Sequence, residues 1–370
     1  MPAPHRSLPN PRLLARRRAI AIVFALSVGI STLSAAQTPT ASDEAPGPAE
    51  GRAEAGASIA LVLPLGSETF GRAAGAVRAG FLAAAAAANI KPLVIGHGDD
   101  DVLTAFNAAK EGGARVIVGP LVRDDLRKLA ASGLDLPPTI ALNQLDDAVQ
   151  LPANVYTLTL TLDSDARQLA HRARDAGAMT VAVIASDSPL QQRFAAAFNA
   201  EWILAGGDAP TMFHFDRSPE VLRSLRSGLI KTRVDAALLA IDGADVALAK
   251  SYIKSTPTYT SNQVNENLTR EARFDLDDVQ FVDIPWLVDP NGAAYAGLKR
   301  PDYPNATLDR LYALGIDAFR VAQAFVDGAP EQLDIDGATG RLSLDSSRQF
   351  MREGKLMVFR SGQVVSAETR

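Results

Sequence analysis

The chain has 370 residues, no cysteine and a formal net charge of −5. This length allows two domains or one protein with two lobes. The lack of cysteine excludes disulfides, zinc–thiolate sites and cysteine nucleophiles. We expect no metal site, because no two of the four histidines have a metal-ligand spacing: His5, His97, His171 and His214.

Residues 1–36 have the pattern of a cleavable export signal. Arg16–Arg18 precede an apolar run, residues 19–33, that is too short for an ordinary membrane span. Small residues follow and place the cleavage after Ala36. We therefore expect a periplasmic protein exported by a cleavable signal peptide, with an uncleaved membrane anchor as the alternative.

Cleavage would make the chain more acidic. The signal holds five arginines and no acidic residue, so its removal takes the formal charge from −5 to −10. An acidic exported protein is a poor candidate for binding nucleic acid or anionic lipid. Residues 37–57 lack large apolar side chains, and this composition predicts a flexible linker.

From Ser58 onward, short apolar runs alternate with amphipathic segments of helical length. In the first series the expected strands are 58–65, 92–97, 115–120, 138–143 and 155–160, and the expected helices are 70–88, 100–113 and 121–133. The strands are nearly continuously apolar, as in a parallel sheet covered by helices on both faces.

The alternation then restarts. The expected helices are 163–177, 189–207, 219–230, 244–254 and 308–328. The expected strands are 180–186, 211–215, 234–241, 257–261 and 279–288, followed by a β-rich tail at 340–345, 356–362 and 363–366.

This order predicts an α/β fold with two doubly wound parallel-sheet lobes joined by several crossovers. We assign residues 58–160 plus 284–330 to lobe 1 and residues 161–283 plus 331–370 to lobe 2. The chain should cross between the lobes near 156–162, 283–289 and 329–340. The gap between such lobes is where ligands usually bind.

The loop after the first strand is the first candidate ligand contact. Ser67 or Thr69 could cap the following helix or donate to a ligand at its amino end. The glycines around this loop fit neither the dinucleotide nor the P-loop spacing, so we expect no cofactor.

Further cleft candidates follow the ends of other strands. The full set is Ser67, Thr69, Asn143, Ser186, Asp187, Asp242, Tyr259 and Gln263. A binder of free amino acids would hold the carboxylate at Ser67 or Thr69 and the ammonium at Asp187 or Asp242. The alternative is that most of these residues cap helices. We expect no catalytic residue, because neither a G-x-S-x-G motif nor a histidine placed for a triad is present.

Several segments resemble one family in order and spacing. They are IALVLPLGSETFGRAAGAVRAGF, VIVGPLVRDDLRKLA, PTIALNQ, DAALLAID, PTYTSNQV, VQFVDIPWLV, LDRLYALGIDAFRVA and DGATGRLSLD. Together they are similar to the penicillin-binding-protein activators of the LppC family, over about 58–366. The resemblance implies a type I periplasmic-binding-protein fold and a non-catalytic regulator that binds a penicillin-binding protein and stimulates peptidoglycan cross-linking.

The resemblance also bears on anchoring. Better-known members of the family are lipoproteins whose lipobox ends in cysteine, and Ala36 stands at that place here. We therefore expect no lipid anchor. The alternative function is a solute-binding protein of an importer, with a small molecule such as an amino acid in the inter-lobe cleft. Trp286 and Tyr295 could form a docking surface, or be buried against a lobe.

Overall fold

The structure, a computed structural model, describes most of the chain after the predicted linker. The described residues are 58–145, 149–253, 255–266 and 268–367. The predicted signal peptide, the cleavage site at Ala36 and the linker 37–57 lie outside them.

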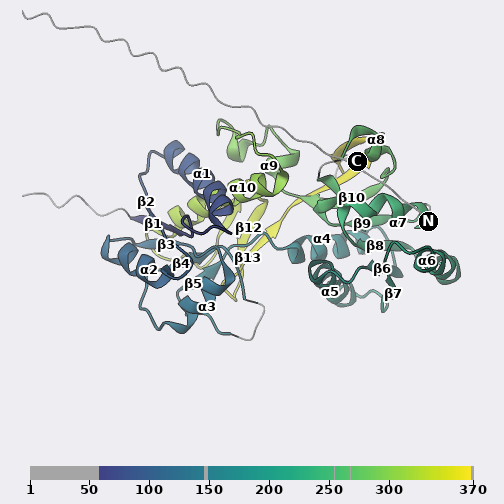
Figure 1. The fold of residues 1–370 in the computed structure, drawn as a ribbon, viewed down its shortest axis with the longest axis horizontal. Helices are drawn as coiled ribbons and strands as arrows, with labels where there is room; N and C mark the ends of the chain where they lie inside the picture. The colour runs from purple at the N-terminus through teal and green to yellow at the C-terminus, as the bar shows by residue number, and fades with distance from the viewer. Residues whose placement is uncertain (1–57, 146–148, 254, 267, 368–370) are drawn as a thin grey trace, which may run out of the picture. The chain divides into compact units, whose positions relative to one another are not determined.

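The first lobe is built on a five-stranded parallel sheet (Figure 1). The strand order is β2–β1–β3–β4–β5, with β1 (Ile59–Leu63), β2 (Leu93–Gly96), β3 (Val116–Val118), β4 (Thr139–Ala141) and β5 (Val155–Thr157). Alternate side chains of β1 enter different cores. Leu61 packs with the helices of one face, α1 (Gly71–Ala87) and α10 (Ala306–Phe325). Val62 packs with those of the other, α2 (Val102–Glu111) and α3 (Arg123–Ala131).

Helices α1 and α10 cross at two glycines. A Cβ atom on Gly80 would lie 1.8 Å from the carbonyl oxygen of Tyr312, and one on Gly315 would lie 2.0 Å from that of Val77. No other residue fits at that distance. The two backbones therefore approach closely, and this contact fixes α10 on the lobe.

The second lobe holds a seven-stranded sheet in the order β15–β14–β10–β9–β8–β6–β7. Its strands are β6 (Val181–Ala185), β7 (Thr211–His214), β8 (Ala236–Ala240), β9 (Thr258–Thr260), β10 (Val279–Asp283), β14 (Lys355–Arg360) and β15 (Gln363–Ser366). The last two are antiparallel to the rest of the sheet and to each other. One face of this sheet is covered by α4 (Leu162–Asp175) and α5 (Pro189–Leu204). The other face is covered by α6 (Pro219–Thr232) and α7 (Val246–Ile253).

Short helices complete the two lobes. They are η1 (Gly243–Asp245), η2 (Asn262–Asn265), α8 (Arg270–Phe274), α9 (Pro285–Val288) and η3 (Ala293–Tyr295). The predicted fold class is confirmed: a parallel sheet and a largely parallel sheet, each covered by helices on both faces, follow one another along the chain.

A third, antiparallel sheet corrects the predicted division between the lobes. It consists of β11 (Asp334–Asp336), β12 (Arg341–Leu344) and β13 (Phe350–Glu353). Sequence analysis assigns these residues to lobe 2, as part of 331–370. Their apolar side chains Leu342 and Phe350 lie instead in the lobe 1 core with α10.

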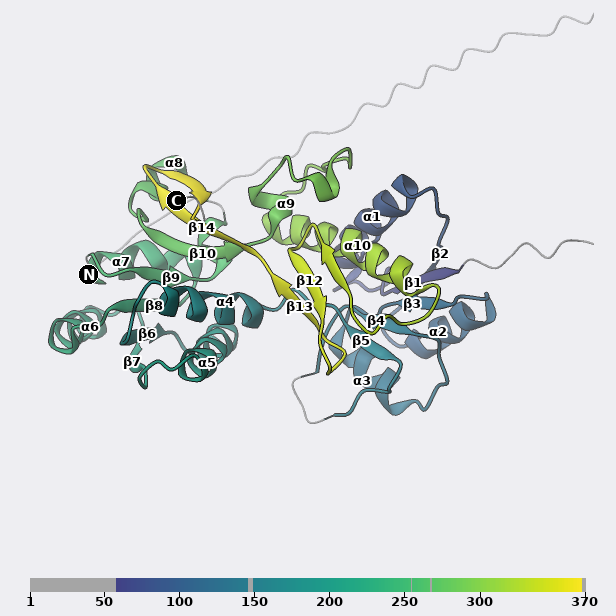
Figure 2. The ribbon, with the colours of Figure 1, turned by 180° about the vertical axis from the view of Figure 1, so that it is seen from behind.

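The chain passes between the lobes three times. The first passage runs from β5 to α4, the second lies at Ile284, and the third lies at Gly354, between β13 and β14. Figure 2 shows the last of these, where the chain leaves β12 and β13 and enters β14. The third passage was predicted at 329–340, which is wrong because β11–β13 intervene.

The segment 284–288, predicted as the end of a strand, is a connection and a short helix. Strand β10 ends at Asp283, whose carboxylate accepts a hydrogen bond of 2.9 Å from the Ile284 N–H. Pro285 then begins α9, and proline suits the first turn of a helix because its missing N–H needs no partner there. Trp286 and Tyr295 are buried, as the second of the two alternatives for them predicted.

Candidate ligand-binding cleft between the lobes

A cleft of about 410 Å³ lies between residues of both lobes. Its walls come from the β3–α3 loop and α10 of lobe 1, the first passage between the lobes, and α5 and η2 of lobe 2. Parallel strands bring their carboxyl ends to one edge of a sheet, and this is where ligands bind in such folds.

Leucine side chains make up the apolar part of the cleft. Seven contribute to its lining: Leu121, Leu142, Leu160, Leu162, Leu190, Leu311 and Leu314. Leu142 and Leu314 also belong to the lobe 1 core, so this wall is continuous with packed protein. Leu190 is half exposed. An apolar surface of this kind favours the binding of a ligand through an apolar group.

The charged side chains of the second-lobe wall form an ion pair with each other. Arg193 of α5 donates from Nε and Nη2 to one carboxylate oxygen of Asp163, over 3.0 and 2.7 Å. Asp163 lies in the first turn of α4, where the helix dipole favours negative charge. The negative charge of Asp163 is therefore stabilised both by Arg193 and by the amino end of α4.

Arg310 links the two lobes under the cleft. It extends from α10 of lobe 1, and its Nε and Nη2 donate to the two carboxylate oxygens of Asp283 over 3.2 and 3.1 Å. Asp283 ends β10 of lobe 2 and is fully buried. Arg310 also pairs with Glu266, beside η2. Burial alone would lower the pKa of Arg310, but Asp283 and Glu266 raise it above its ordinary value.

A second buried pair lies nearby. Arg352 of β13 in lobe 1 pairs with Asp165 of α4 in lobe 2, and Asn262 donates a 3.3 Å hydrogen bond to the other oxygen of Asp165. Burial raises the pKa of Asp165 to about 6, against the opposing effect of Arg352. Two arginines of lobe 1 therefore bind two acids of lobe 2.

Of the eight predicted cleft residues, Asn143 and Gln263 line this cleft. Asn143 donates to the Leu121 carbonyl over 2.9 Å, and its amide oxygen accepts from Arg123 over 3.3 Å. The side-chain oxygen of Gln263 accepts a 2.6 Å hydrogen bond from Gln191. Both side chains already have protein partners.

The other predicted residues lie elsewhere. The Ser67 hydroxyl is buried and accepts a 3.1 Å hydrogen bond from the Phe70 N–H at the start of α1. Thr69 lines a separate hollow of about 610 Å³ between the loop that precedes this helix and α3. The proposed carboxylate holders therefore do not face the cleft in this structure.

The second-lobe candidates do not line the cleft either. Asp187 is exposed and lies 3.5 Å from the imidazole of His214. Asp242 is exposed at the start of η1, and Tyr259 is buried in the core of β9, where burial raises the pKa of its hydroxyl. The Ser186 hydroxyl is buried without a hydrogen-bond partner among the described residues.

Sequence reasoning missed the charged residues that line the cleft: Arg123, Asp163, Arg193, Glu266 and Arg310. One signal was available. Arg310 lies one helical turn before Leu314, on the buried side of α10, and a charge on a buried face requires a partner.

The described residues hold no group of three histidine and acidic side chains that could bind a metal ion. No helix in the described ranges has the length and apolar character needed to cross a membrane. The cleft therefore offers apolar surface and hydrogen-bonded polar groups.

A family model covers most of the described chain. The family described as "LppC putative lipoprotein" matches residues 53–362. The chain belongs to the LppC family. The resemblance inferred from the sequence segments is thereby confirmed.

Two curated relatives of this LppC-family chain share one name. "Penicillin-binding protein activator LpoA" from Pasteurella multocida is 26% identical over 322 residues, covering 83% of this chain and 54% of that protein. The protein of the same name from Haemophilus influenzae is 25% identical, with the same coverage. The chain spans about half the length of the curated relatives it matches.

Solved structures confirm the type I periplasmic-binding-protein fold of the LppC-family chain. One, described as "a putative branched-chain amino acid ABC transporter from Chromobacterium violaceum", has a TM-score of 0.73 and 32% identity, covering 81% of this chain and 99% of that one. Another, "LpoA (YraM) C-domain from Haemophilus influenzae, a regulator of PBP1A", has a TM-score of 0.73 and 23% identity, covering 84% and 99%.

Proposed function

We propose that this LppC-family chain is a non-catalytic periplasmic regulator of peptidoglycan synthesis that binds a penicillin-binding protein and activates it. One observation carries the proposal, namely the family match over residues 53–362. Relatives that align with this region are named penicillin-binding protein activators. The partner and the process are taken from those names.

The chemistry of the cleft supports a role in recognition. No histidine, serine or cysteine is among the residues that line it, and its two acids are each paired with an arginine. The lining therefore lacks the serine or cysteine nucleophile and the histidine base of the common hydrolase sites. The pairing of both acids with arginines favours recognition over acid–base chemistry.

The contacts between the lobes support the same role. Arg310 and Arg352 of lobe 1 are held by Asp283 and Asp165 of lobe 2, and both pairs are buried. Separating them would leave charges without partners in a protein interior, which is unfavourable. A fixed arrangement of the lobes suits a protein that presents a surface to a partner.

Export and the absence of a lipid anchor are part of the proposal. They depend on residues 1–36, with Ala36 at the place of the family's lipobox cysteine. Mass spectrometry of the chain isolated from its source would test both. Cleavage after Ala36 without added lipid is the expected result, and a retained or lipidated amino terminus would contradict it.

Reconstitution tests the central claim. The purified chain is added to a bifunctional penicillin-binding protein of its own source with lipid-linked precursor, and cross-linked peptides are counted by chromatography. We expect more cross-links in its presence and co-sedimentation of the two proteins. The control is an unrelated two-lobed amino-acid-binding protein. Unchanged cross-linking together with no binding would overturn the proposal.

A second candidate is a solute-binding protein of an importer. It is favoured by the 32% identity to the Chromobacterium structure, which the alignment covers over 99% of its length. A thermal-unfolding screen with free amino acids separates the two. A true ligand at a hundred times its dissociation constant would stabilise the fold by about 2.7 kcal/mol. We expect no such shift.

A further inference from the structure

The second sheet ends at strand β7, and no strand of the described chain lies beyond it. Figure 1 shows β7 at the margin of the second lobe, beside α5. It pairs in parallel with β6 on its inner side, with Thr211 opposite Ala182 and His214 opposite Ala185. The other side of its backbone is therefore open to a further strand.

The open side of β7 is the side to which the backbone groups of Met212 and His214 point. The Phe215 N–H, immediately after β7, donates to the Ala185 carbonyl of β6 over 2.9 Å. Along a strand the backbone groups of successive residues alternate in direction, so those of Phe213 also point to β6 and those of Met212 and His214 point away from it. An extended peptide can therefore form main-chain hydrogen bonds at these two residues.

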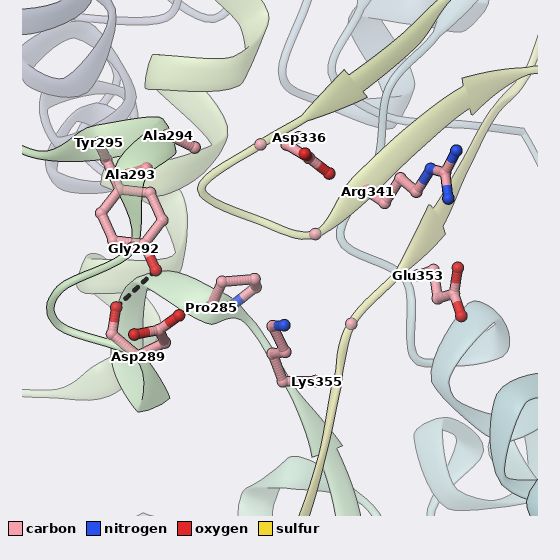
Figure 3. A pocket seen from close by; sticks show the side chains of 13 residues that line it. Pro285, Asp289, Gly292, Ala293, Ala294, Tyr295, Asp336, Arg341, Glu353 and Lys355 are labelled. Atoms are coloured by element: carbon pink, nitrogen blue, oxygen red, sulfur yellow. Dashed lines mark hydrogen bonds between the residues drawn. The ribbon is translucent and has the colours of Figure 1, made fainter. Parts of the chain in front are cut away.

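Three other sheet edges carry features that oppose the addition of a strand. Strand β11 of the small third sheet holds Asp334 and Asp336, and Figure 3, a close view of the hollow beside the third passage, shows the Asp336 carboxylate at the end of that strand. The edge of β5 is covered, because Thr157 bridges to Gln349. Strand β2 follows Pro92. Charges, covering segments and proline all protect an edge, whereas β7, with the sequence TMFH, has neither proline nor a permanently charged side chain.

Exposed apolar side chains lie beside this edge. Met212 is 53% exposed, and Ile203, near the end of α5, is 54% exposed. The side-chain amide of Asn199 lies 3.5 Å from the Met212 sulfur, and Ile203 follows Asn199 by one helical turn, so both apolar side chains lie on the same side of α5. Met179, also half exposed, is next to the loop after α5, because its carbonyl accepts a 3.3 Å hydrogen bond from the Asp208 N–H. Exposed apolar patches of this kind mark surfaces that bind other proteins.

Acidic side chains lie at the ends of β7. Asp208 precedes the strand, Asp216 follows it, and Asp187 lies 3.5 Å from the imidazole of His214 at its end. All three acids are exposed. Basic residues at the ends of a bound segment would complement them, whereas a second copy of β7 would bring like charges together.

The basic side chains near β7 do not cancel these acids on the Met212 side. Arg217, next to Asp216, is paired with Asp245 over 2.6 Å. The arginines of α6 belong to the other face of the sheet, because α6 packs there against Phe213, in the same core as Leu222 and Leu225. The apolar patch and the acids at the strand ends are therefore what an added segment would meet beside α5.

We propose that β7 binds an extended segment of a partner protein, which adds a strand to the second sheet. Apolar side chains on one face of the segment pack on Met212 and Ile203, and basic residues at its ends lie near Asp208 and Asp216. Main-chain hydrogen bonds supply affinity, and these side-chain contacts supply specificity. That the partner is the penicillin-binding protein rests on the proposed function, whereas the surface and its chemistry do not.

A synthetic peptide tests this surface. The probe is Lys-Val-Thr-Val-Thr-Val-Lys, blocked at both ends and labelled with a fluorophore, and its anisotropy is followed as the full chain is added. We expect saturable binding that weakens roughly 10-fold or more in each of two variants. His214→Pro removes an outward N–H without breaking a bond to β6, and Met212→Lys replaces apolar surface by a charge on the edge. The matched control, Val365→Lys, places the same charge on β15, the opposite edge of the sheet, and should bind like the wild type. Thermal unfolding confirms that each variant is folded.

Altered peptides supply the second comparison. Lys-Val-Pro-Pro-Pro-Val-Lys lacks the central N–H groups and should not bind measurably, and the peptide with aspartate in place of both lysines should bind more weakly than the probe. No binding of the probe by the wild type, equal binding by both edge variants, or equal binding of either altered peptide would each overturn the proposal. Co-sedimentation of the unmodified chain with the penicillin-binding protein, measured without peptide, reports separately on the proposed function.

Discussion

Arg352 and Asp165 form a buried ion pair that joins β13 of the first lobe to α4 of the second. The third passage between the lobes begins immediately after Arg352, and Asn262 binds the second oxygen of Asp165. Any rotation of one lobe relative to the other would therefore move Arg352 and Asp165 apart. The energetics of the pair can be tested one residue at a time.

Arg352→Met should destabilise the protein strongly at pH 8. The substitution leaves Asp165 buried without its counter-charge, which typically costs about 3–5 kcal/mol in the free energy of unfolding. Urea denaturation measures the change. The control is Arg341→Met, which removes one partner of an exposed pair and should have a much smaller effect. Equal effects of the two variants would contradict the prediction.

Asp165→Asn should flatten the dependence of stability on pH. Burial raises the pKa of Asp165 from 3.8 to about 6 in the folded chain. Between these values the folded state retains a proton that the unfolded chain has released. The contribution of this group is therefore full below about pH 4 and declines, by on the order of 2 kcal/mol, as the pH rises to 6.

The measurement is the free energy of unfolding at several pH values from 4 to 7. The decline with rising pH should be smaller in Asp165→Asn than in the wild type. Asp235→Asn serves as the control, because backbone N–H groups of Met179 and Thr180 lower the pKa of that exposed carboxyl. Its effect should be constant over this range. If the free energy of unfolding falls with pH as steeply in Asp165→Asn as in the wild type, the Asp165 carboxyl does not cause the decline.

Gly315→Ala should destabilise the first lobe, although alanine favours helices in general. A Cβ at this position would lie 2.0 Å from the Val77 carbonyl oxygen, so α1 and α10 would have to separate. Overpacking of this kind costs about 1–3 kcal/mol. Gly75→Ala in α1 is the matched control, because nothing lies within 4 Å of its Cβ position. It should stabilise the chain by about 0.5–1 kcal/mol. Thermal or urea unfolding would show the two opposite changes in stability, a loss for Gly315→Ala and a gain for Gly75→Ala.

The two main sheets could be predicted from the sequence because their strands are short, apolar and separated by helical segments. The strands β11 and β13 were not predicted. Strand β13 alternates Phe350 and Arg352 inward, and the buried arginine disguises the period-2 apolar pattern. Its position in the first lobe depends on core contacts with α10, which no local pattern encodes.

The position of the cleft between the lobes could be predicted from the sequence, but most of its lining residues could not. Asn143 and Gln263 were found because they follow strands whose carboxyl ends meet at one edge. Ser67 was chosen for the same reason, but its hydroxyl is directed to the Phe70 N–H. The charged residues were missed because Arg310 and Glu266 are 44 positions apart, and only the folded chain brings them together.

Arg310 should be the residue on which the arrangement of the lobes depends most. Arg310→Met would leave the fully buried Asp283 with the Ile284 N–H as its one remaining partner among the described residues, and we expect a loss of about 3–5 kcal/mol. Arg310→Lys keeps the charge but cannot donate to both oxygens of Asp283, so its loss should be smaller but still measurable.

Two comparisons make the Arg310 prediction specific. Arg360→Met, which breaks an exposed pair with Asp278, should cost less than about 1 kcal/mol. Glu266→Gln should have much less effect than Arg310→Met, because the Glu266 side chain is partly exposed and can be hydrated. If the lobes are held mainly by Asp283 and Arg310, the order of urea midpoints is Arg360→Met, then Arg310→Lys, then Arg310→Met, from highest to lowest. An Arg310→Met midpoint equal to that of Arg360→Met would mean that other contacts hold the lobes.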